Sequence, residues 1–471
     1  MILLEDKIYI NLEHVSHPIF ASIKNDLTIT NPTWLQAKKL ELSPWGKSQF
    51  LKFYSVEGDH LILPTGYINK LLQKFPSDQQ PKVIDARFEN PKKYSLHFTG
   101  KLYSFQQAAC DEAMSRSFGI IQAPTGAGKT VQMIYLITQR QQPTIILVDQ
   151  IELGDQFVDQ LKKFTNLKDS DIGFIGNGKF SIRPITVALL QTMHRLDDRY
   201  YNIINKYIGQ VFCDEVHIVA ADTYYNVMSN LKAKYKFGFS ATPKRVDGLT
   251  DVIFWATGPI IYKIPLEQVS IIIKPRIVRI KTDYKFPLIS VREYGDMISD
   301  LSLDDARNNL IVKTVESSEF SSLQKALLCV RVIQVIELSQ KIPDSDILIS
   351  NISKEDRQYF IKKLGEEQAK IIFSKSSKAH RKQVIQDLHS GKLKTVISTY
   401  GLFSKGIDIQ NLQLLAFCAP IRSEIIVKQC RGRVMRRAGE EVPIILDFED
   451  HCVELLKWQA RDRYNHLLNY T

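Results

Sequence analysis

The sequence predicts an α/β protein with two parallel-sheet domains and a small α+β domain at its N-terminus. Short apolar runs alternate with helical patterns over residues 98–260, and the alternation returns over residues 301–455. Strands that alternate with helices in this way favour a parallel sheet with crossover helices. A chain of 471 residues is also long enough for two or three domains.

Residues 1–97 precede the first alternating block and predict the small α+β domain. Alternating runs at 7–12 and 50–54 indicate strands, and turn signals occur at Asn31-Pro32 and Gly58-Asp59. The block is rich in lysine and aromatic residues, namely Trp34, Lys38, Lys39, Trp45, Lys47, Lys52 and Tyr54. Such residues can stack on bases and bind phosphates, with Lys38 and Lys39 as the candidate contacts. The rings can equally fill a small core, which is our preferred interpretation for each ring taken singly.

The most informative motif lies in the block 98–260. Residues 123–130 read Ala-Pro-Thr-Gly-Ala-Gly-Lys-Thr, after an apolar run at 118–121 and before a helical pattern at 131–138. A strand, a glycine loop and a helix in this order form a phosphate cradle, because backbone N–H groups and the positive end of the helix dipole face the anion. Lys129 can reach the β and γ phosphates of a nucleotide, and Thr130 can ligate Mg²⁺. The candidate nucleotide contacts are Pro124, Thr125, Gly126, Ala127, Gly128, Lys129 and Thr130.

Two further motifs follow apolar runs of the same block. Asp214-Glu215-Val216-His217 comes after the run 210–213, and Ser240-Ala241-Thr242-Pro243 comes after Phe237–Phe239. Asp214 can hold Mg²⁺ together with Thr130, and Glu215 can orient or deprotonate an attacking water. Ligands of parallel sheets collect at the carboxyl ends of the strands, so we expect these motifs beside the glycine loop. A solvated strand end is the alternative for the two acids. The strand candidates of this block are Ile145–Val148, Ile185–Leu189, Val211–Cys213 and Phe237–Ser240.

The block 301–455 carries a cluster of arginines. Residues 429–436 read Gln-Cys-Arg-Gly-Arg-Val-Met-Arg. Arg433 and Arg436 lie three residues apart and therefore share one face of a helix, whereas Arg431 lies off that face. A basic surface helix is the alternative. The strand candidates here are Ala326–Val330, Asp346–Ser350, Ile371–Ser374, Thr395–Ser398, Leu414–Cys418 and Ile444–Phe448.

Two segments complete the chain. Residues 261–300 contain Pro265, Pro275 and Pro287 among repeated isoleucines and lysines, which predicts a crossing segment with extended pieces. Residues 456–471 predict a basic, aromatic C-terminal helix packed on the domain before it.

The charge balance favours a polyanionic partner. Lys plus Arg is 62 and Asp plus Glu is 51, which gives a net charge of +11. A basic surface attracts nucleic acid, although solubility alone can explain such an excess.

The cysteines and the N-terminus bear on the compartment. The six cysteines show no paired metal spacing, and Cys452 beside His451 forms one Cys–His pair without a second. That usage fits a reducing cytosol. The N-terminus carries acids where a signal peptide needs bases, and no apolar run approaches the ~18 residues of a membrane span. We therefore expect a cytoplasmic protein.

Together these motifs resemble those of superfamily 2 nucleic-acid helicases, which place a nucleotide cleft between two RecA-like domains. Residues 102–106, Leu-Tyr-Ser-Phe-Gln, resemble the Q motif, in which a glutamine reads adenine. Leu190-Gln191-Thr192 resembles a motif that contacts the nucleic-acid backbone, and residues 398–408 resemble motif V. Residues 240–248, Ser-Ala-Thr-Pro-Lys-Arg-Val-Asp-Gly, are similar to those of the branch that acts on DNA repair and recombination substrates, with phage UvsW-type helicases as the nearest likeness. The resemblance covers about 98–450.

The resemblance implies two RecA-like motor domains, ATP and Mg²⁺ as cofactors, and a monomer in a bacterial or phage-infected cytoplasm. It implies catalytic roles for Lys129, Asp214, Glu215, Arg433 and Arg436, with Arg436 as the arginine finger and Arg433 as a γ-phosphate contact. Beyond the glycine loop, it implies ATP contacts by Phe105, Gln106, His217, Gly406, Asp408 and Gln429. It implies coupling by Ser240, Ala241 and Thr242, and DNA contacts by Gln191, Thr192, Arg245 and Thr399. The implied function is an ATP-dependent DNA helicase or translocase that unwinds or branch-migrates forked or branched DNA in recombination, repair or replication.

Two alternatives stay open. Asp-Glu-X-His also occurs in RNA helicases, so an RNA substrate is possible. A non-catalytic DNA-binding or annealing protein could also keep the fold, although intact motif residues argue against it. Asp149, Gln150 and Leu189 depart from the residues common in the family at positions that concern nucleic-acid contacts.

Overall fold

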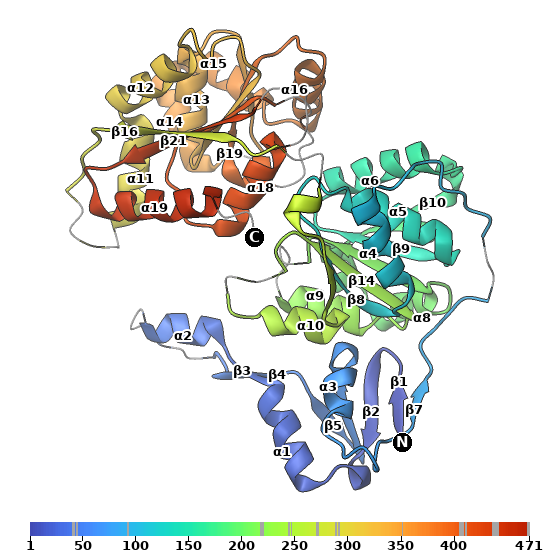
Figure 1. Ribbon diagram of the computed structural model, residues 1–471. Coiled ribbons are helices and arrows are strands. Elements are labelled where there is room, and N and C mark those ends of the chain that lie inside the picture. Colours follow the sequence, from blue (N-terminus) through green and yellow to red (C-terminus); the bar gives the residue numbers. More distant parts are fainter. Residues whose placement is uncertain are drawn as a thin grey trace. The chain divides into compact units, whose positions relative to one another are not determined.

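The computed structural model divides the chain into two compact units, Met1–Gln268 and Val269–Thr471 (Figure 1). It describes all residues except 40–42, 44–45, 92–93, 217–220, 244, 246, 270–272, 288–289, 291–292, 351, 405–408, 410–411, 436–441 and 469–471, together with the side chain of Lys39. Among the described residues, no helix is both long enough and apolar enough to cross a membrane.

The N-terminal region of the first unit contains a five-stranded sheet in the order β5-β6-β2-β1-β7. The strands are β1 (Ile2–Leu4), β2 (Lys7–Asn11), β5 (Ser55–Glu57), β6 (His60–Pro64) and β7 (Val83–Asp85). Along β2, Ile8 and Ile10 are buried and their neighbours are partly exposed, which is the alternation of a strand with one face on a core. The helices of this region are α1 (His17–Asp26), α2 (Pro32–Lys39) and α3 (Ile68–Leu72), and a separate ribbon pairs β3 (Thr28–Thr30) with β4 (Phe50–Lys52).

The core of this N-terminal region extends onto the domain that follows it. Its buried residues form one cluster with Val252 and Trp255 of α10 (Thr250–Thr257). The ring of Phe53 lies 5.0 Å from the ring of Tyr225 and 5.1 Å from that of Trp255. The predicted domain 1–97 is therefore packed on the helices of the domain that follows it.

The larger sheet of the first unit has eight strands in the order β11-β10-β12-β9-β13-β14-β8-β15. Only β11 pairs antiparallel among the described strands of this sheet. The strands are β8 (Phe118–Gln122), β9 (Thr144–Val148), β10 (Ile172–Gly176), β11 (Lys179–Ser181), β12 (Ile185–Leu189), β13 (Gln210–Asp214), β14 (Tyr235–Ser240) and β15 (Ile260–Lys263). All residues of β9 and β12 are buried, as expected for strands covered by helices on both faces. The strand candidates of this block are thus confirmed.

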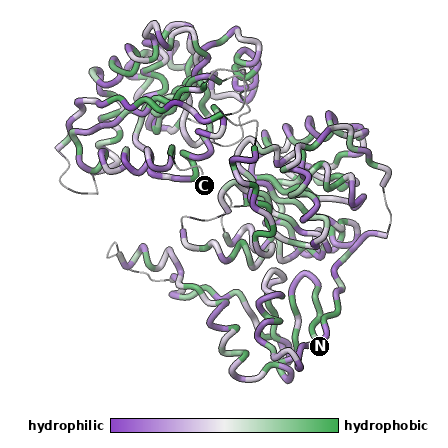
Figure 2. Tube along the Cα trace, viewed as in Figure 1, coloured by the Kyte–Doolittle hydropathy of each residue, from purple (hydrophilic) through white to green (hydrophobic). Residues whose placement is uncertain are grey.

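Helices of this sheet connect its successive strands. They are α5 (Lys129–Arg140), α6 (Ile151–Phe164), α7 (Leu190–His194), α8 (Asp198–Asn205), α9 (Ala221–Ser229) and α10, and the helix α4 (Ser104–Met114) precedes the first strand, β8. Figure 2 shows the hydrophobic stretches gathered along the strands, with hydrophilic stretches on the outward faces of the helices.

The second unit is built on a six-stranded parallel sheet in the order β16-β21-β20-β17-β19-β18. The strands are β16 (Arg276–Thr282), β17 (Lys325–Cys329), β18 (Ser345–Leu348), β19 (Thr395–Thr399), β20 (Leu414–Phe417) and β21 (Ile444–Asp450). The helices are α11 (Tyr294–Leu303), α12 (Asp305–Val315), α13 (Val332–Lys341), α14 (Lys354–Leu364), α15 (Glu366–Ser374), α16 (Lys378–His389), α17 (Tyr400–Ser404), α18 (Glu424–Val434) and α19 (Glu454–Leu468). The predicted fold class, two RecA-like parallel-sheet domains with an N-terminal region of strands and helices, is confirmed.

One predicted strand is wrong. Residues Ile371–Ser374 end the helix α15 instead of forming a strand. Ala369 and Ile372 lie three residues apart and are buried, whereas Ile371 is 57% exposed. A short apolar run does not distinguish a strand from a helix, and here the buried positions follow the helical period.

The predicted crossing segment 261–300 includes the boundary between the two units, Gln268 and Val269. It contains most of the edge strand β15 of the first sheet, the edge strand β16 of the second and the helix α11. Pro265 and Pro275 lie outside both strands, where a missing N–H breaks no ladder.

Candidate nucleotide site

The glycine loop lies between β8 and α5 and depends on two glycines with left-handed backbone. Gly126 has φ 89° and Gly128 has φ 72°, and Gly128 caps the N-terminus of α5. A side chain is strained at such angles. At Gly128 a Cβ would also overlap Nε2 of Gln106. The loop therefore keeps its backbone open toward the N-terminus of α5, where phosphates bind.

Lys129 opens α5 and forms an ion pair with Glu215, which follows β13. The two side chains are 10% and 17% exposed, so the pair is largely shielded from water. Glu215 has φ 51°, a left-handed conformation that costs energy in a residue other than glycine and is typical of functional sites. The Glu215 carboxylate holds the ammonium of Lys129, and a nucleotide phosphate would compete for the same charge.

Asp214 ends β13 and is fully buried. Burial, reinforced by the charge of Glu215, raises the pKa of Asp214 to about 6, and the ammonium of Lys129 opposes that rise. Its Oδ1 has no hydrogen-bond partner among the described residues. A buried carboxylate oxygen without a donor is costly unless a cation or water satisfies it. With the hydroxyl of Thr130 on α5, this oxygen fits Mg²⁺, which prefers oxygen ligands.

Gln106 braces the glycine loop. Its Nε2 donates to the carbonyl of Ala127 at 2.9 Å, and its Oε1 accepts from the backbone N–H of Tyr103 at 3.0 Å. The predicted ATP contact is thus used here to cap α4 and to hold the loop. Phe105, another predicted ATP contact, is buried, and its ring stacks on that of Tyr103 with centroids 5.6 Å apart.

Unlike Phe105, the nearby aromatic residue Tyr103 is not among the ATP contacts predicted from the sequence. It is 49% exposed, whereas Phe105 is 4% exposed. Tyr103 stands at the N-cap of α4, so its side chain lies outside the buried face of that helix. The position of the helix boundary could have shown from the sequence that Tyr103 is exposed and Phe105 is buried.

The predicted coupling residues contact the start of the glycine loop. Ser240 ends β14 beside β8, and its carbonyl accepts from the N–H of Ala123 at 2.9 Å. The Ser240 hydroxyl accepts from the N–H of Thr242 at 3.1 Å, and the carbonyl of Ala241 accepts from Gln122 at 3.4 Å. A shift of this segment would therefore displace the start of the glycine loop.

The predicted nucleic-acid contacts of the first unit lie in three places. Gln191 is exposed and Thr192 half-buried on the short helix α7, which follows β12. The Nε of Arg245 donates to Asp247 at 3.0 Å, so a phosphate would have to compete with that carboxylate. Lys38 is exposed, with its ammonium 5.2 Å from the ring centroid of the half-buried Trp34.

Three expectations for the N-terminal region have different outcomes. Tyr54 packs against the described core, as preferred. Trp34 is only half-buried and contacts Lys38, which keeps the basic and aromatic interpretation open for this ring. The side chain of Lys39 and all of Trp45 lie outside the described residues.

In the second unit, α18 carries the arginine motif. Gln429 and Arg433 are buried, and Nη2 of Arg433 donates to the carbonyl of Ser404 at 2.9 Å, at the end of α17. Thr399 ends β19, directly before α17. Arg433 therefore ties the arginine motif to the motif V segment.

Arg431 has a separate role from Arg433. Its Nη1 donates to the carbonyls of His466 and Leu467 at 2.8 and 3.0 Å. These are C-terminal carbonyls of α19, which lack partners within the helix and attract a cation. The predictions for His217, Gly406, Asp408 and Arg436 fall on residues outside those described.

The glycine loop, the ammonium of Lys129 and the paired acids at the carboxyl end of β13 define an ATP-hydrolysing class of protein. Two family models match the chain. The model described as type III restriction enzyme, res subunit, matches residues 99–245, and the helicase conserved C-terminal domain matches residues 325–438. The chain belongs to the superfamily 2 helicases, which are nucleic-acid-dependent ATPases.

Several proteins are similar over most of the chain. The mimivirus protein named "Putative ATP-dependent RNA helicase L396" is 25% identical, with 97% of this chain and 83% of the relative covered. The DNA 3'-5' translocase XPB2 of Sulfurisphaera tokodaii is also 25% identical, with 73% and 81% covered. The S. cerevisiae Dbp5 structure aligns with a TM-score of 0.52 at 15% identity and covers 79% of this chain and 88% of Dbp5, which supports the fold. The T4 UvsW structure aligns over 100% of this chain and 97% of UvsW at 17% identity, with a TM-score of 0.41.

Proposed function

We propose that the chain is an ATP-dependent DNA helicase or translocase that remodels forked or branched DNA. The observation that carries the catalytic part is the convergence of Lys129, Asp214 and Glu215 beside the glycine loop. The DNA part is supported by the Arg245-X-Asp-Gly pattern and by the translocase XPB2, whose name specifies DNA. The net charge of +11 agrees with a polyanionic partner.

In the proposed cycle the first unit binds and activates ATP. Lys129 exchanges its carboxylate partner for the γ phosphate, where its charge stabilises the transferring phosphoryl group. The exchange releases Glu215 to accept a proton from the attacking water. Thr130 and Asp214 would hold Mg²⁺, which neutralises phosphate charge when bound. Arg433 and Arg436 of the second unit are the proposed contacts that sense the γ phosphate.

Coupling to nucleic acid is proposed to use the segment Ser240–Thr242. The Ser240 carbonyl accepts from the N–H of Ala123 in the glycine loop, and the Ala241 carbonyl accepts from the side chain of Gln122 at the end of β8, so the end of β14 is linked directly to the start of the loop. Gln191, Thr192 and Thr399 are the proposed backbone contacts, with Arg245 added when its pair with Asp247 opens. The ribbon β3–β4 and the helix α2 are proposed to contact the branch point, because Lys38, Leu35 and Phe50 are exposed there.

Unwinding assays with matched substrates test the proposal. Forks, four-way junctions, D-loops and RNA duplexes of one sequence are compared at a fixed salt concentration, because affinity for nucleic acid depends strongly on salt. The proposal expects ATP-dependent unwinding or branch migration of the DNA substrates and little of the RNA duplex. Lys129→Ala is the inactive control.

An RNA helicase is the second candidate, supported by the name of the mimivirus relative. Preferential unwinding of the RNA duplex would favour it. Binding and annealing without any ATP hydrolysis would instead favour a non-catalytic protein.

A further inference from the structure

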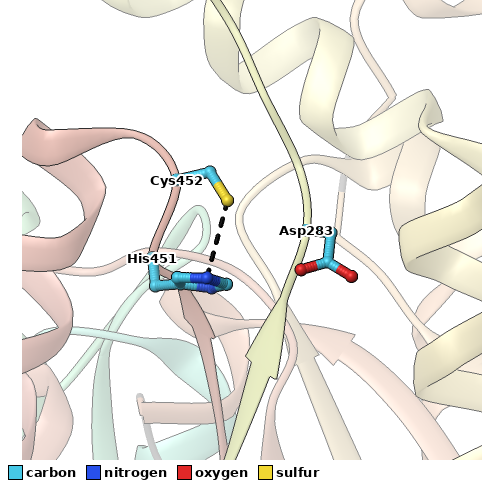
Figure 3. A group of neighbouring side chains, drawn as sticks. All are labelled: Asp283, His451 and Cys452. Carbon is cyan, nitrogen blue, oxygen red and sulfur yellow. Dashed lines mark hydrogen bonds between the residues drawn. The ribbon is translucent and has the colours of Figure 1, made fainter.

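We propose that Asp283, His451 and Cys452 form a binding site for a transition-metal ion of the zinc class. Each offers one ligand atom, and the three atoms lie within 4.8 Å of one another (Figure 3). A thiolate, an imidazole and a carboxylate are the ligand types that zinc takes in proteins. All three residues belong to the second unit, and none of them is among the predicted nucleotide contacts.

The sheet register brings these residues together. The neighbouring parallel strands β16 and β21 pair Thr282 with Asp450, so Asp283 and His451 leave the sheet side by side. Both strand ends are fixed, because Asp450 accepts from the Thr282 hydroxyl and from the buried Arg307, each at 2.6 Å. The backbone that carries Asp283 and His451 is therefore held in place.

The orientation of His451 leaves one ring nitrogen for a metal. Its Nδ1 lies 2.8 Å from the carbonyl oxygen of Thr282. A carbonyl can only accept, so Nδ1 carries the proton and Nε2 presents a lone pair. Metal-binding histidines are commonly held by such a hydrogen bond from the other nitrogen.

The spacing of sulfur and nitrogen agrees with a tetrahedral ion. The Sγ of Cys452 lies 3.6 Å from Nε2 of His451. Metal–sulfur and metal–nitrogen bonds of about 2.3 and 2.05 Å at a tetrahedral angle put those two atoms about 3.6 Å apart. Asp283 and Cys452 are exposed, so an ion can enter from solvent and keep a water as its fourth ligand.

Cobalt binding to the full-length protein tests the site, with Mg²⁺ in excess to occupy the carboxylate site at Asp214. Cys452 is exposed and the other five cysteines are buried, so a sulfur-to-cobalt charge-transfer band reports on Cys452. We expect a band that saturates at one equivalent, disappears on addition of Zn²⁺ and is absent in Cys452→Ser. His451→Gln and Asp283→Asn should each weaken cobalt binding about tenfold or more. His389→Gln, an exposed histidine on α16, is the matched control and should titrate like wild type.

Alkylation gives a second readout that does not depend on cobalt. Zn²⁺ at a concentration just sufficient to saturate wild type should slow iodoacetamide labelling of Cys452 about tenfold or more in wild type and much less in His451→Gln. Absence of the charge-transfer band, or its retention in Cys452→Ser, would overturn the proposal. Cobalt affinity unchanged by Asp283→Asn would overturn the three-ligand site. Thermal melting of each variant checks that the substitutions leave the fold intact.

Discussion

Lys129 and Glu215 lie 86 positions apart in the chain and form a largely buried ion pair between the start of α5 and the end of β13. The pair joins the residue that would bind the γ phosphate to the residue that would activate the water. Because one ammonium cannot serve both partners fully, phosphate binding at Lys129 and release of the Glu215 carboxylate are linked. In the proposed cycle, this link would make water activation depend on nucleotide binding.

Glu215→Gln should bind ATP and hydrolyse it slowly. Glutamine can hold a water without accepting its proton, so we expect turnover to fall about 10²–10⁴-fold. ATP affinity should stay equal or rise, because the substitution removes the carboxylate that competes for Lys129. Fluorescent-nucleotide binding and single-turnover hydrolysis measure the two effects separately. Glu367→Gln, an exposed residue on α15, is the control. A Glu215→Gln variant with normal hydrolysis would remove this residue from the mechanism.

Asp214→Asn should stabilise the protein in the absence of Mg²⁺ at neutral pH. The folded-state pKa of Asp214 is raised to about 6, above its ordinary value, so the folded state binds this proton more tightly than the unfolded state. The stability from this group is therefore present at low pH and is lost as the pH rises toward 6. Asparagine cannot ionise, so the variant avoids that loss.

Urea unfolding of Asp214→Asn and wild type between pH 4 and 8 measures this effect. The difference in unfolding free energy should grow with pH and level off above about 6, at roughly 2–3 kcal/mol. A difference that is independent of pH would mean that Asp214 does not titrate in this range. The variant should also lose Mg²⁺-dependent ATP hydrolysis, since its neutral amide lacks the negative charge that a carboxylate offers the ion.

Arg436→Ala and Arg431→Ala should affect different properties, the first turnover and the second stability. Arg436→Ala should lower turnover about 10³-fold or more with little change in melting temperature, as expected for an arginine finger. Arg431→Ala should mainly lower stability, by about 1.5–3 kcal/mol, because two carbonyls at the end of α19 lose their charged donor. Steady-state ATPase and thermal melting of both variants decide between the roles. If Arg436→Ala only weakens DNA binding, the motif is a basic patch.

Lys38→Ala should weaken binding to forked DNA and make the binding less dependent on salt. A phosphate contact contributes to the slope of log affinity against log salt by about one unit. Lys354→Ala, on α14, is a matched control. Equal affinity and slope for Lys38→Ala and wild type would leave the N-terminal region without a phosphate contact at this residue. Point variants suit this region better than deletion of residues 1–97, because that deletion would expose Val252 and Trp255 on α10.

The sequence predicts most strands of the two large sheets, because several motifs follow apolar runs of strand length, whereas β10, β11 and β16 are not among its strand candidates. The glycine loop, Asp214 and Ser240 all come at strand ends, and parallel topology gathers strand ends at one edge. That rule is sufficient to predict their proximity without coordinates.

The features that the sequence does not predict depend on contacts between distant segments. Phe53 and Trp255 pack in one core although roughly 200 residues separate them in the chain. Asp283 meets His451 only through the register of β16 with β21. The ion pair of Lys129 with Glu215 depends on the left-handed backbone of Glu215, which no residue preference signals.

Steady-state ATP hydrolysis tests the central claim most directly. It is measured for wild type and Lys129→Ala, each with forked DNA, with RNA of the same sequence and without nucleic acid. The account predicts hydrolysis by wild type that forked DNA stimulates more strongly than RNA, and no hydrolysis above background by Lys129→Ala under any condition. Lys168→Ala, an exposed lysine remote from the loop in sequence, should behave like wild type. Hydrolysis by Lys129→Ala at the wild-type rate, or wild-type hydrolysis that no nucleic acid stimulates, would contradict it.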